Sequence, residues 1–534
     1  MRISALGASR MLLYGGWEDW RDEMSGRQNE VPIQQGVSPG GQELVRLGAN
    51  YTLYRYKKEN CPFVPSPPGE QLPIFALLGA GAEPEPYQPY LDEGVSLSPA
   101  GTTRESFTTA QSKTLQELVE ALSASPELLL YIHGCNNSSA TVADRTNTYP
   151  SELLKDTQEK DGSAGIGVWL SYDWPGERAF FGKTLGRSLR TAAELACYMA
   201  VWLLLLAAPL LLVGLAVSGL THSQLAFLTA LGLVAVLALI AGALVFTLWL
   251  LRATSYERDL YMALHRGVPD LCEFLRYLDY AYYERHKGDS QDPATTQESL
   301  VPEKRIKLHV IAHSMGTMIT LDTVRVLSDL FDRAPGEKPS AGLGRSLAVS
   351  TLALVAADVP VELLQVSQNN YVYSALRRFD RMCVFSNAHD AVLHTLGYFA
   401  NSFAEPQPGR SRSRLGTVFH RRGEARPPAT ADVCQRRWLR NEPVFEFKTG
   451  DPVADPGLIR ERLTFIDCSQ RPKLSRGFIR LFADFPPVRD LLALLFYRWV
   501  DCHAGYFDDD RVWEKLHDVI RRKMKPGEQG NEVL

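Results

Sequence analysis

Short apolar runs alternate with stretches of helical periodicity along most of this chain. Between the runs, residues 115–122 and 317–327 place apolar side chains on one face of a helix. Strands that alternate with helices favour a mostly parallel sheet covered on both faces, the α/β fold class. The runs that predict strands lie at residues 128–132, 165–172, 306–311, 350–355, 381–385 and 463–466.

Two longer apolar stretches interrupt this alternation. Residues 195–220 and 225–251 contain no charged residue, and each is longer than the roughly 20 apolar residues that cross a bilayer as a helix. Two buried core helices are the alternative, but soluble helices rarely stay apolar on every side. The sequence therefore predicts a hairpin of two transmembrane helices, joined by the short turn Thr221–Gln224.

Charges beside this hairpin predict its orientation. Cations precede the first span and follow the second, whereas the connecting turn carries none. Because positively charged flanks stay in the cytoplasm, we expect an integral protein of the inner (cytoplasmic) membrane with the predicted α/β body on the cytoplasmic side. The bilayer is then a partner. The cations are Arg178, Lys183, Arg187, Arg190, Arg252 and Arg258.

These patterns divide the chain into five parts. We expect an irregular N-terminal extension over 1–112, in which 51–56 could form a strand, then a first core part over 113–190. The hairpin occupies 191–252, the second core part 253–524, and a tail 525–534. An arginine-rich insertion at about 402–445 is by default a solvated loop; contact with anionic lipid head groups is the second interpretation.

Composition argues against nucleic acid and metal ions as partners. The 534 residues are 45% hydrophobic and carry a net charge of -4, so no global basic field attracts nucleic acid. Eight cysteines are scattered without a CxxC pair, which indicates reduced thiols and no zinc site. We expect no cofactor. The N-terminus lacks the apolar segment of a cleavable signal peptide.

Candidate chemistry centres on residues 305–327, where a predicted strand leads through a tight turn into a predicted helix. The turn carries Ser314 between Ala312 and Gly316. A serine between small residues at such a bend is typical of a nucleophile elbow, which exposes the hydroxyl at the carboxyl edge of the sheet. The usual motif begins with glycine, so Ala312 is a mild departure, and an ordinary strand-to-helix turn is the alternative.

A second motif follows the strand at 128–132. His133 and Gly134 stand where serine hydrolases of this class place a loop that binds a developing oxyanion. Backbone N–H groups of Gly134, Cys135 and Asn136 are candidates for one donor, and the N–H of Met315 for the second. A plain turn at the end of a strand is the alternative.

A catalytic serine needs a histidine and a carboxylate, in the chain order serine, acid, histidine. Asp390 and Asp358 each follow a predicted strand beyond the elbow, and Asp390 is preferred because the acid more often follows the second such strand. For the base we prefer His503, in a loop beyond the last strand. The other candidates for the base are His517 on a predicted helix, His420 in the arginine-rich insertion, and His313. A metal site made by His503 with Asp508–Asp510 also remains open.

The ordered segments YIHGCNNS, LSYDWPG, YERDLYMAL, VIAHSMG, AADV, FSNAHDAVL, SRLG and CHAGYF span Leu128–Phe507. Together they resemble a bacterial family of α/β hydrolases of uncharacterised function. The resemblance implies the α/β-hydrolase fold and a serine esterase or lipase-like activity, with the triad at Ser314, Asp390 and His503. Ala312, Cys135 and the inserted hairpin depart from the family pattern.

Three functions stay open at this point. The first is a membrane-anchored serine hydrolase that cleaves a lipid or another acyl ester. The second is a non-catalytic membrane scaffold that keeps the hydrolase shell. The third keeps the enzyme but makes it an antibacterial phospholipase toxin.

Overall fold

A single mixed sheet organises the parts of the chain that the computed structural model describes. Its nine strands lie in the order β1-β2-β4-β3-β5-β6-β7-β8-β9, and only β1 runs antiparallel to its neighbour. The described residues are 51–56, 72–79, 81–90, 104–160, 167–176, 253–287, 300, 304–328, 343–360, 375–376, 378–387, 390, 392–397, 414–417, 463–468, 503, 505–521 and 532–533, with isolated positions between 224 and 247.

The six predicted strands are all present. They are β3 (Glu127–Ile132), β4 (Val168–Asp173), β5 (Ile306–His313), β6 (Leu347–Val355), β7 (Arg381–Ser386) and β8 (Leu463–Asp467). The central strands β3, β5 and β6 are almost wholly buried, as expected for strands covered on both faces. The prediction of a mostly parallel α/β sheet is therefore confirmed.

Three strands lie outside the predicted core. β1 (Thr52–Arg55) lies within 51–56, where a strand was considered possible, and β2 (Ile74–Leu78) comes from the rest of the segment expected to be an irregular extension; β2 pairs in parallel with β4. At the other edge, the two-residue β9 (Glu532–Val533) pairs with β8, so β8 is not the last strand as expected. A two-residue strand such as β9 carries too little hydrophobic pattern to be separated from a loop, and β2 lies in a stretch rich in proline and glycine, which predicts a loop.

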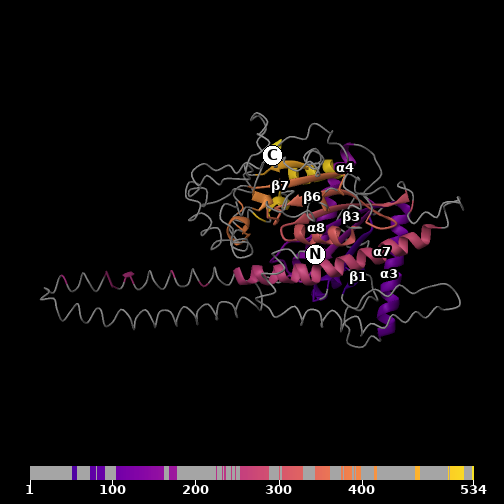
Figure 1. The fold of residues 1–534 in the computed structure, drawn as a ribbon, viewed down its shortest axis with the longest axis horizontal. Coiled ribbons are helices and arrows are strands. Elements are labelled where there is room, and N and C mark those ends of the chain that lie inside the picture. The colour runs from indigo at the N-terminus through magenta and orange to yellow at the C-terminus, as the bar shows by residue number, and fades with distance from the viewer. Residues whose placement is uncertain are drawn as a thin grey trace, which may run out of the picture.

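Helices cover both faces of the sheet (Figure 1). One face packs against α3 (Arg104–Ala124), α7 (Val268–His286) and α8 (Gly316–Leu327), and the other against α4 (Ser139–Lys160) and α13 (Asp510–Ile520). Helical residues 253–262 and the π-helical η3 (Ala263–Gly267) lead directly into α7. Short helical turns are η2 (Glu85–Tyr90), η7 (Leu393–Gly397), η8 (Leu415–Thr417) and η11 (Gly505–Asp508).

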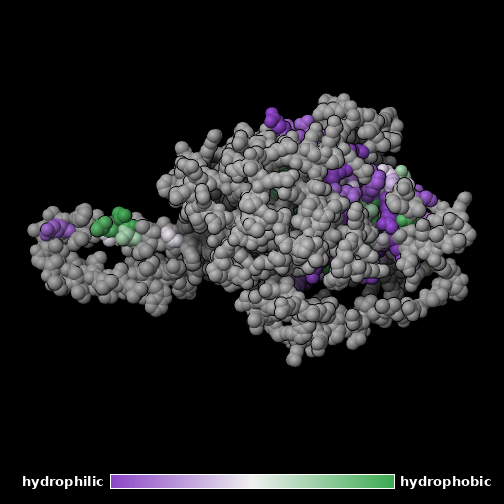
Figure 2. All heavy atoms as spheres, turned by 45° about the horizontal axis from the view of Figure 1, so that its top comes forward, coloured by the Kyte–Doolittle hydropathy of each residue, from purple (hydrophilic) through white to green (hydrophobic). Residues whose placement is uncertain are grey.

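Most of the predicted hairpin, 191–252, lies outside the described residues. Within the part that is described, no helix is both long and apolar enough to cross a membrane. Two described positions of the second apolar stretch are exposed: the exposed fractions of Leu231 and Val234 are 54% and 62%. Figure 2 shows hydrophobic described residues gathered at one end of the molecule, whereas those visible on its body are mostly hydrophilic.

Candidate active site

Ser314 lies between β5 and α8 with a left-handed backbone, φ 52°. A residue other than glycine adopts this conformation only when its surroundings hold it there, and the Ser314 N–H donates to the carbonyl of Val355 at 2.9 Å. Gly316 is required because a Cβ there would lie 2.6 Å from the carbonyl oxygen of Ile132. These features give the local geometry expected of the elbow, and Ala312 fits within β5 without change of register.

The imidazole of His503 bridges Ser314 and Asp390. Its Nε2 lies 2.7 Å from the Ser314 Oγ, and its Nδ1 lies 2.7 Å from the Asp390 Oδ2. All three side chains are buried. The other carboxylate oxygen of Asp390 accepts the N–H groups of Val392 and Leu393, each at 3.1 Å. The carboxylate is thus fixed to the chain on one side and to the imidazole on the other.

His313 holds the backbone of His503 in place. Its Nε2–H donates to the carbonyl oxygen of His503 at 2.9 Å. Burial first, and then the positive potential of His503 and Arg145, holds the pKa of the His313 imidazole well below its ordinary value. A neutral His313 therefore anchors the backbone of His503 without adding a charge beside it.

Asp358, the other candidate acid, has different partners. Its Oδ1 lies 3.2 Å from the Nε of Arg414, and its Oδ2 accepts the hydroxyl of Tyr256 at 2.6 Å. Arg414 also donates to the carbonyl of Gly397 at 3.0 Å. The structure therefore places Asp358 in a buried ion pair rather than beside an imidazole.

Arg414 departs from what its sequence context predicted. It belongs to the arginine-rich segment expected to be a solvated loop or to meet lipid head groups, yet only 2% of its side chain is exposed. It is buried because an aspartate at the end of β6 neutralises it, a contact between positions 56 residues apart. The segment's other arginines lie outside the described residues.

The loop after β3 passes directly over the serine. A Cβ at Gly134 would lie 2.5 Å from the Cβ of Ser314 and 3.1 Å from its Oγ, so only glycine fits. The Asn136 N–H, one of the three expected donors, is already engaged by the Asp259 carboxylate at 2.9 Å. Across the described residues, the N–H groups of Cys135 and Met315 have no hydrogen-bond partner.

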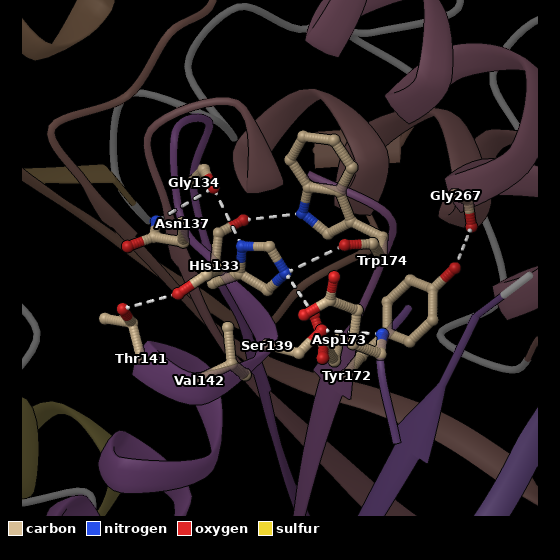
Figure 3. Close-up of polar contacts among 12 residues, drawn as sticks. His133, Gly134, Asn137, Ser139, Thr141, Val142, Tyr172, Asp173, Trp174 and Gly267 are labelled. Atoms are coloured by element: carbon tan, nitrogen blue, oxygen red, sulfur yellow. Dashed lines mark hydrogen bonds and ion pairs between the residues drawn. The ribbon is translucent and has the colours of Figure 1, made fainter. Parts of the chain in front are cut away.

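His133, the first residue of this loop, belongs to a polar cluster that the sequence did not predict (Figure 3). The Nδ1 of His133 lies 2.8 Å from the carbonyl oxygen of Gly134, and its Nε2 lies 3.1 Å from the Asp173 Oδ1. Tyr87 donates to the other oxygen of Asp173 at 2.9 Å. Trp174 stacks on the His133 ring with centroids 5.0 Å apart.

The remaining predicted candidates lie elsewhere. His517 is buried in α13, and His420 falls outside the described residues. Asp509 caps α13 by accepting the Arg511 N–H, which occupies one carboxylate of the possible metal site. Among the residues that the structure describes, no three His, Cys, Asp or Glu side chains are grouped so that they could hold a metal ion.

Comparison with known proteins adds no relative. No protein family, curated protein or solved structure matches the chain.

Proposed function

We propose that this chain is a membrane-anchored serine hydrolase of the α/β-hydrolase fold that cleaves carboxylic esters. One observation carries the proposal: a single imidazole lies 2.7 Å from a serine hydroxyl and 2.7 Å from a buried carboxylate. The chain order of Ser314, Asp390 and His503 is the order of this fold class. The sheet supports it further, because serine and acid follow β5 and β7 at the same edge.

The proposed first step is acylation of Ser314. The Ser314 Oγ attacks the ester carbonyl carbon while the Nε2 of His503 takes the hydroxyl proton. Asp390 accepts the Nδ1–H of His503, holds the reactive tautomer and stabilises the imidazolium. The tetrahedral intermediate then collapses, the bond to the alcohol oxygen breaks, and His503 gives its proton to that oxygen. Water attacks the acyl-enzyme by the same route and releases the acid.

The two unengaged N–H groups suit the developing negative charge. The N–H of Cys135 belongs to the loop after β3, and the N–H of Met315 belongs to the start of α8, directly after Ser314. Preorganised backbone donors of this kind commonly contribute about 10²–10³ in kcat each. Asn136 is not proposed as a donor because Asp259 already accepts its N–H.

The substrate class follows from the predicted hairpin. A catalytic body held at the cytoplasmic face of a membrane meets lipids and other acyl esters at high local concentration. The exposed Leu231 and Val234 in the second apolar stretch support burial of that stretch in lipid.

A fluorophosphonate probe tests the reaction. We expect the detergent-solubilised protein to be labelled and the Ser314→Ala variant to remain unlabelled, with matching hydrolysis of a panel of chromogenic esters and phospholipids. Equal labelling of both proteins would exclude Ser314 as the nucleophile. A folded wild type that reacts with neither the probe nor any ester would favour the scaffold function.

A further inference from the structure

The inference concerns the loop His133–Asn137 and rests on the proposed function. Its backbone is held at several points, by side chains of the loop itself and by Trp174. The carbonyl of His133 accepts the indole N–H of Trp174 at 2.8 Å, and the carbonyl of Gly134 accepts the Asn137 amide at 2.9 Å (Figure 3). The His133 ring holds the same Gly134 carbonyl from a second direction.

These contacts fix the direction of one N–H. No peptide bond of the described chain is cis, and in a trans peptide the C=O and N–H point in opposite directions. Because the Gly134 carbonyl is held on the side of His133 and Asn137, the Cys135 N–H of the same peptide points away from them. This is the donor that the proposed mechanism needs.

The next peptide is held at both of its polar groups: the Cys135 carbonyl accepts the Asn137 amide at 3.2 Å, and the Asn136 N–H meets Asp259. Asn136 has a left-handed backbone, φ 58°, which costs free energy for any residue other than glycine. Its N–H donates to the Asp259 Oδ2 at 2.9 Å, and Arg258 contacts the other oxygen of that carboxylate at 2.9 Å. Only 2% of the Asp259 side chain is exposed, so this hydrogen bond is shielded from water.

We propose that Asp259 is a positioning residue for catalysis. By holding the Asn136 N–H, the Asp259 carboxylate acts together with the contacts to the Gly134 carbonyl. Both are needed to keep the loop turned so that the Cys135 N–H meets the substrate oxygen in the transition state. Without the hydrogen bond to Asp259, Asn136 relaxes toward a right-handed or extended backbone and the donor moves. A shift of about 1 Å in a catalytic group can cost about 10²-fold in rate.

Asp279 supplies a matched control on the same helical segment. It lies on α7, where its carboxylate accepts the N–H groups of Arg345, Ser346 and Leu347 at 3.0, 2.7 and 3.0 Å. It therefore performs the same structural task as Asp259, but for the segment that leads into β6, at the opposite edge of the sheet from Ser314.

The experiment compares Asp259→Ala, Asp259→Asn and Asp279→Ala in the full chain in detergent. We expect Asp259→Ala to lower kcat by about 10- to 100-fold with little change in KM, since the donor acts in the transition state. Asp259→Asn keeps an oxygen that can accept the Asn136 N–H, so it should recover most of the kcat. Asp279→Ala should lower the melting temperature and leave kcat unchanged.

A second measurement separates positioning from folding. An aldehyde analogue of the ester should bind Asp259→Ala more weakly by the same factor as the loss in kcat, because both need the oxyanion donor. Equal kcat in Asp259→Ala and Asp279→Ala, or a rise in KM alone, would overturn the proposal. Loss of probe labelling in the wild type would instead refute the proposed function, so the two failures are distinguishable.

Discussion

The loops that follow β6 and β7 each carry a buried aspartate, and the two aspartates have different partners. Each strand is buried, each runs parallel in the sheet, and each leads into a loop with a fully buried aspartate, Asp358 or Asp390. Asp390 meets an imidazole, whereas Asp358 meets the guanidinium of Arg414. A guanidinium never gives up its proton in a protein, so it can neutralise a carboxylate but cannot exchange a proton with a serine. Partner chemistry, rather than position on the sheet, distinguishes the two acids.

The sharpest test of this comparison replaces each aspartate by asparagine. We expect Asp390→Asn to lower kcat by about 10⁴-fold, because an amide favours the wrong tautomer of His503. Asp358→Asn should keep kcat close to that of the wild type in the fraction that folds. Initial rates on a chromogenic ester, normalised to the amount of folded protein by circular dichroism, show which aspartate acts with His503. The reverse ranking would transfer the role of the acid to Asp358.

Removing the guanidinium should affect stability more than chemistry. Arg414→Ala leaves the Asp358 carboxylate buried without its cation, and we expect the free energy of unfolding to fall by about 3–5 kcal/mol. The double variant Asp358→Leu with Arg414→Met removes both charges and should lose much less. Denaturant unfolding in detergent measures both, and equal losses would show that the charge pair is not what holds this end of β6.

The support of His503 by His313 predicts a dependence of stability on pH. Because folding lowers the pKa of His313, the unfolded chain binds a proton that the folded chain does not. The free energy of unfolding is then greatest above the ordinary pKa of 6.5 and falls below it by about 1.4 kcal/mol per pH unit. The loss continues until the lowered folded pKa is reached.

His313→Gln is the control for this pH dependence. A glutamine amide can still donate to the His503 carbonyl but does not titrate. In this variant the free energy of unfolding should therefore fall less steeply with decreasing pH, by about 1.4 kcal/mol per pH unit. Thermal melts at a series of pH values between neutral and acidic compare the two proteins. An unchanged slope would show that other groups account for the loss in acid.

The smallest expected effect concerns the Cys135 thiol, in the loop after β3, whose pKa responds to the charges of both Asp358 and Asp390. Burial, followed by the negative charges of Asp259 and Asp358, raises its pKa well above the ordinary value. We expect slow alkylation by iodoacetamide near neutral pH and faster alkylation as pH rises. Peptide mapping after timed labelling measures the rate. Asp358→Asn should speed the reaction slightly, and a fast reaction at neutral pH in the wild type would contradict the stated cause.

Much of the fold was readable from local pattern. Six central strands and α8 appear close to the predicted bounds because buried parallel strands are short, continuous apolar runs. The juxtaposition of Ser314, Asp390 and His503 was also predicted, because parallel strands bring their carboxyl ends to one edge. Of the other three strands, β1 lies within 51–56, which was predicted only as a possible strand, whereas β2 and β9 were not predicted. β2 lies in a stretch rich in proline and glycine, and β9 has only two residues, so neither stands out from a loop.

By itself, the sequence determined the alternation of strands and helices, the bend at Ser314 and the few residues able to do acyl-transfer chemistry, because these depend on neighbours along the chain. Only the tertiary structure decided which aspartate faces the imidazole, that Arg414 is buried, and that Asp259 takes the Asn136 N–H. Those contacts join positions 56 to 123 residues apart. No periodicity records such pairings, because each depends on how the whole sheet brings its loops together.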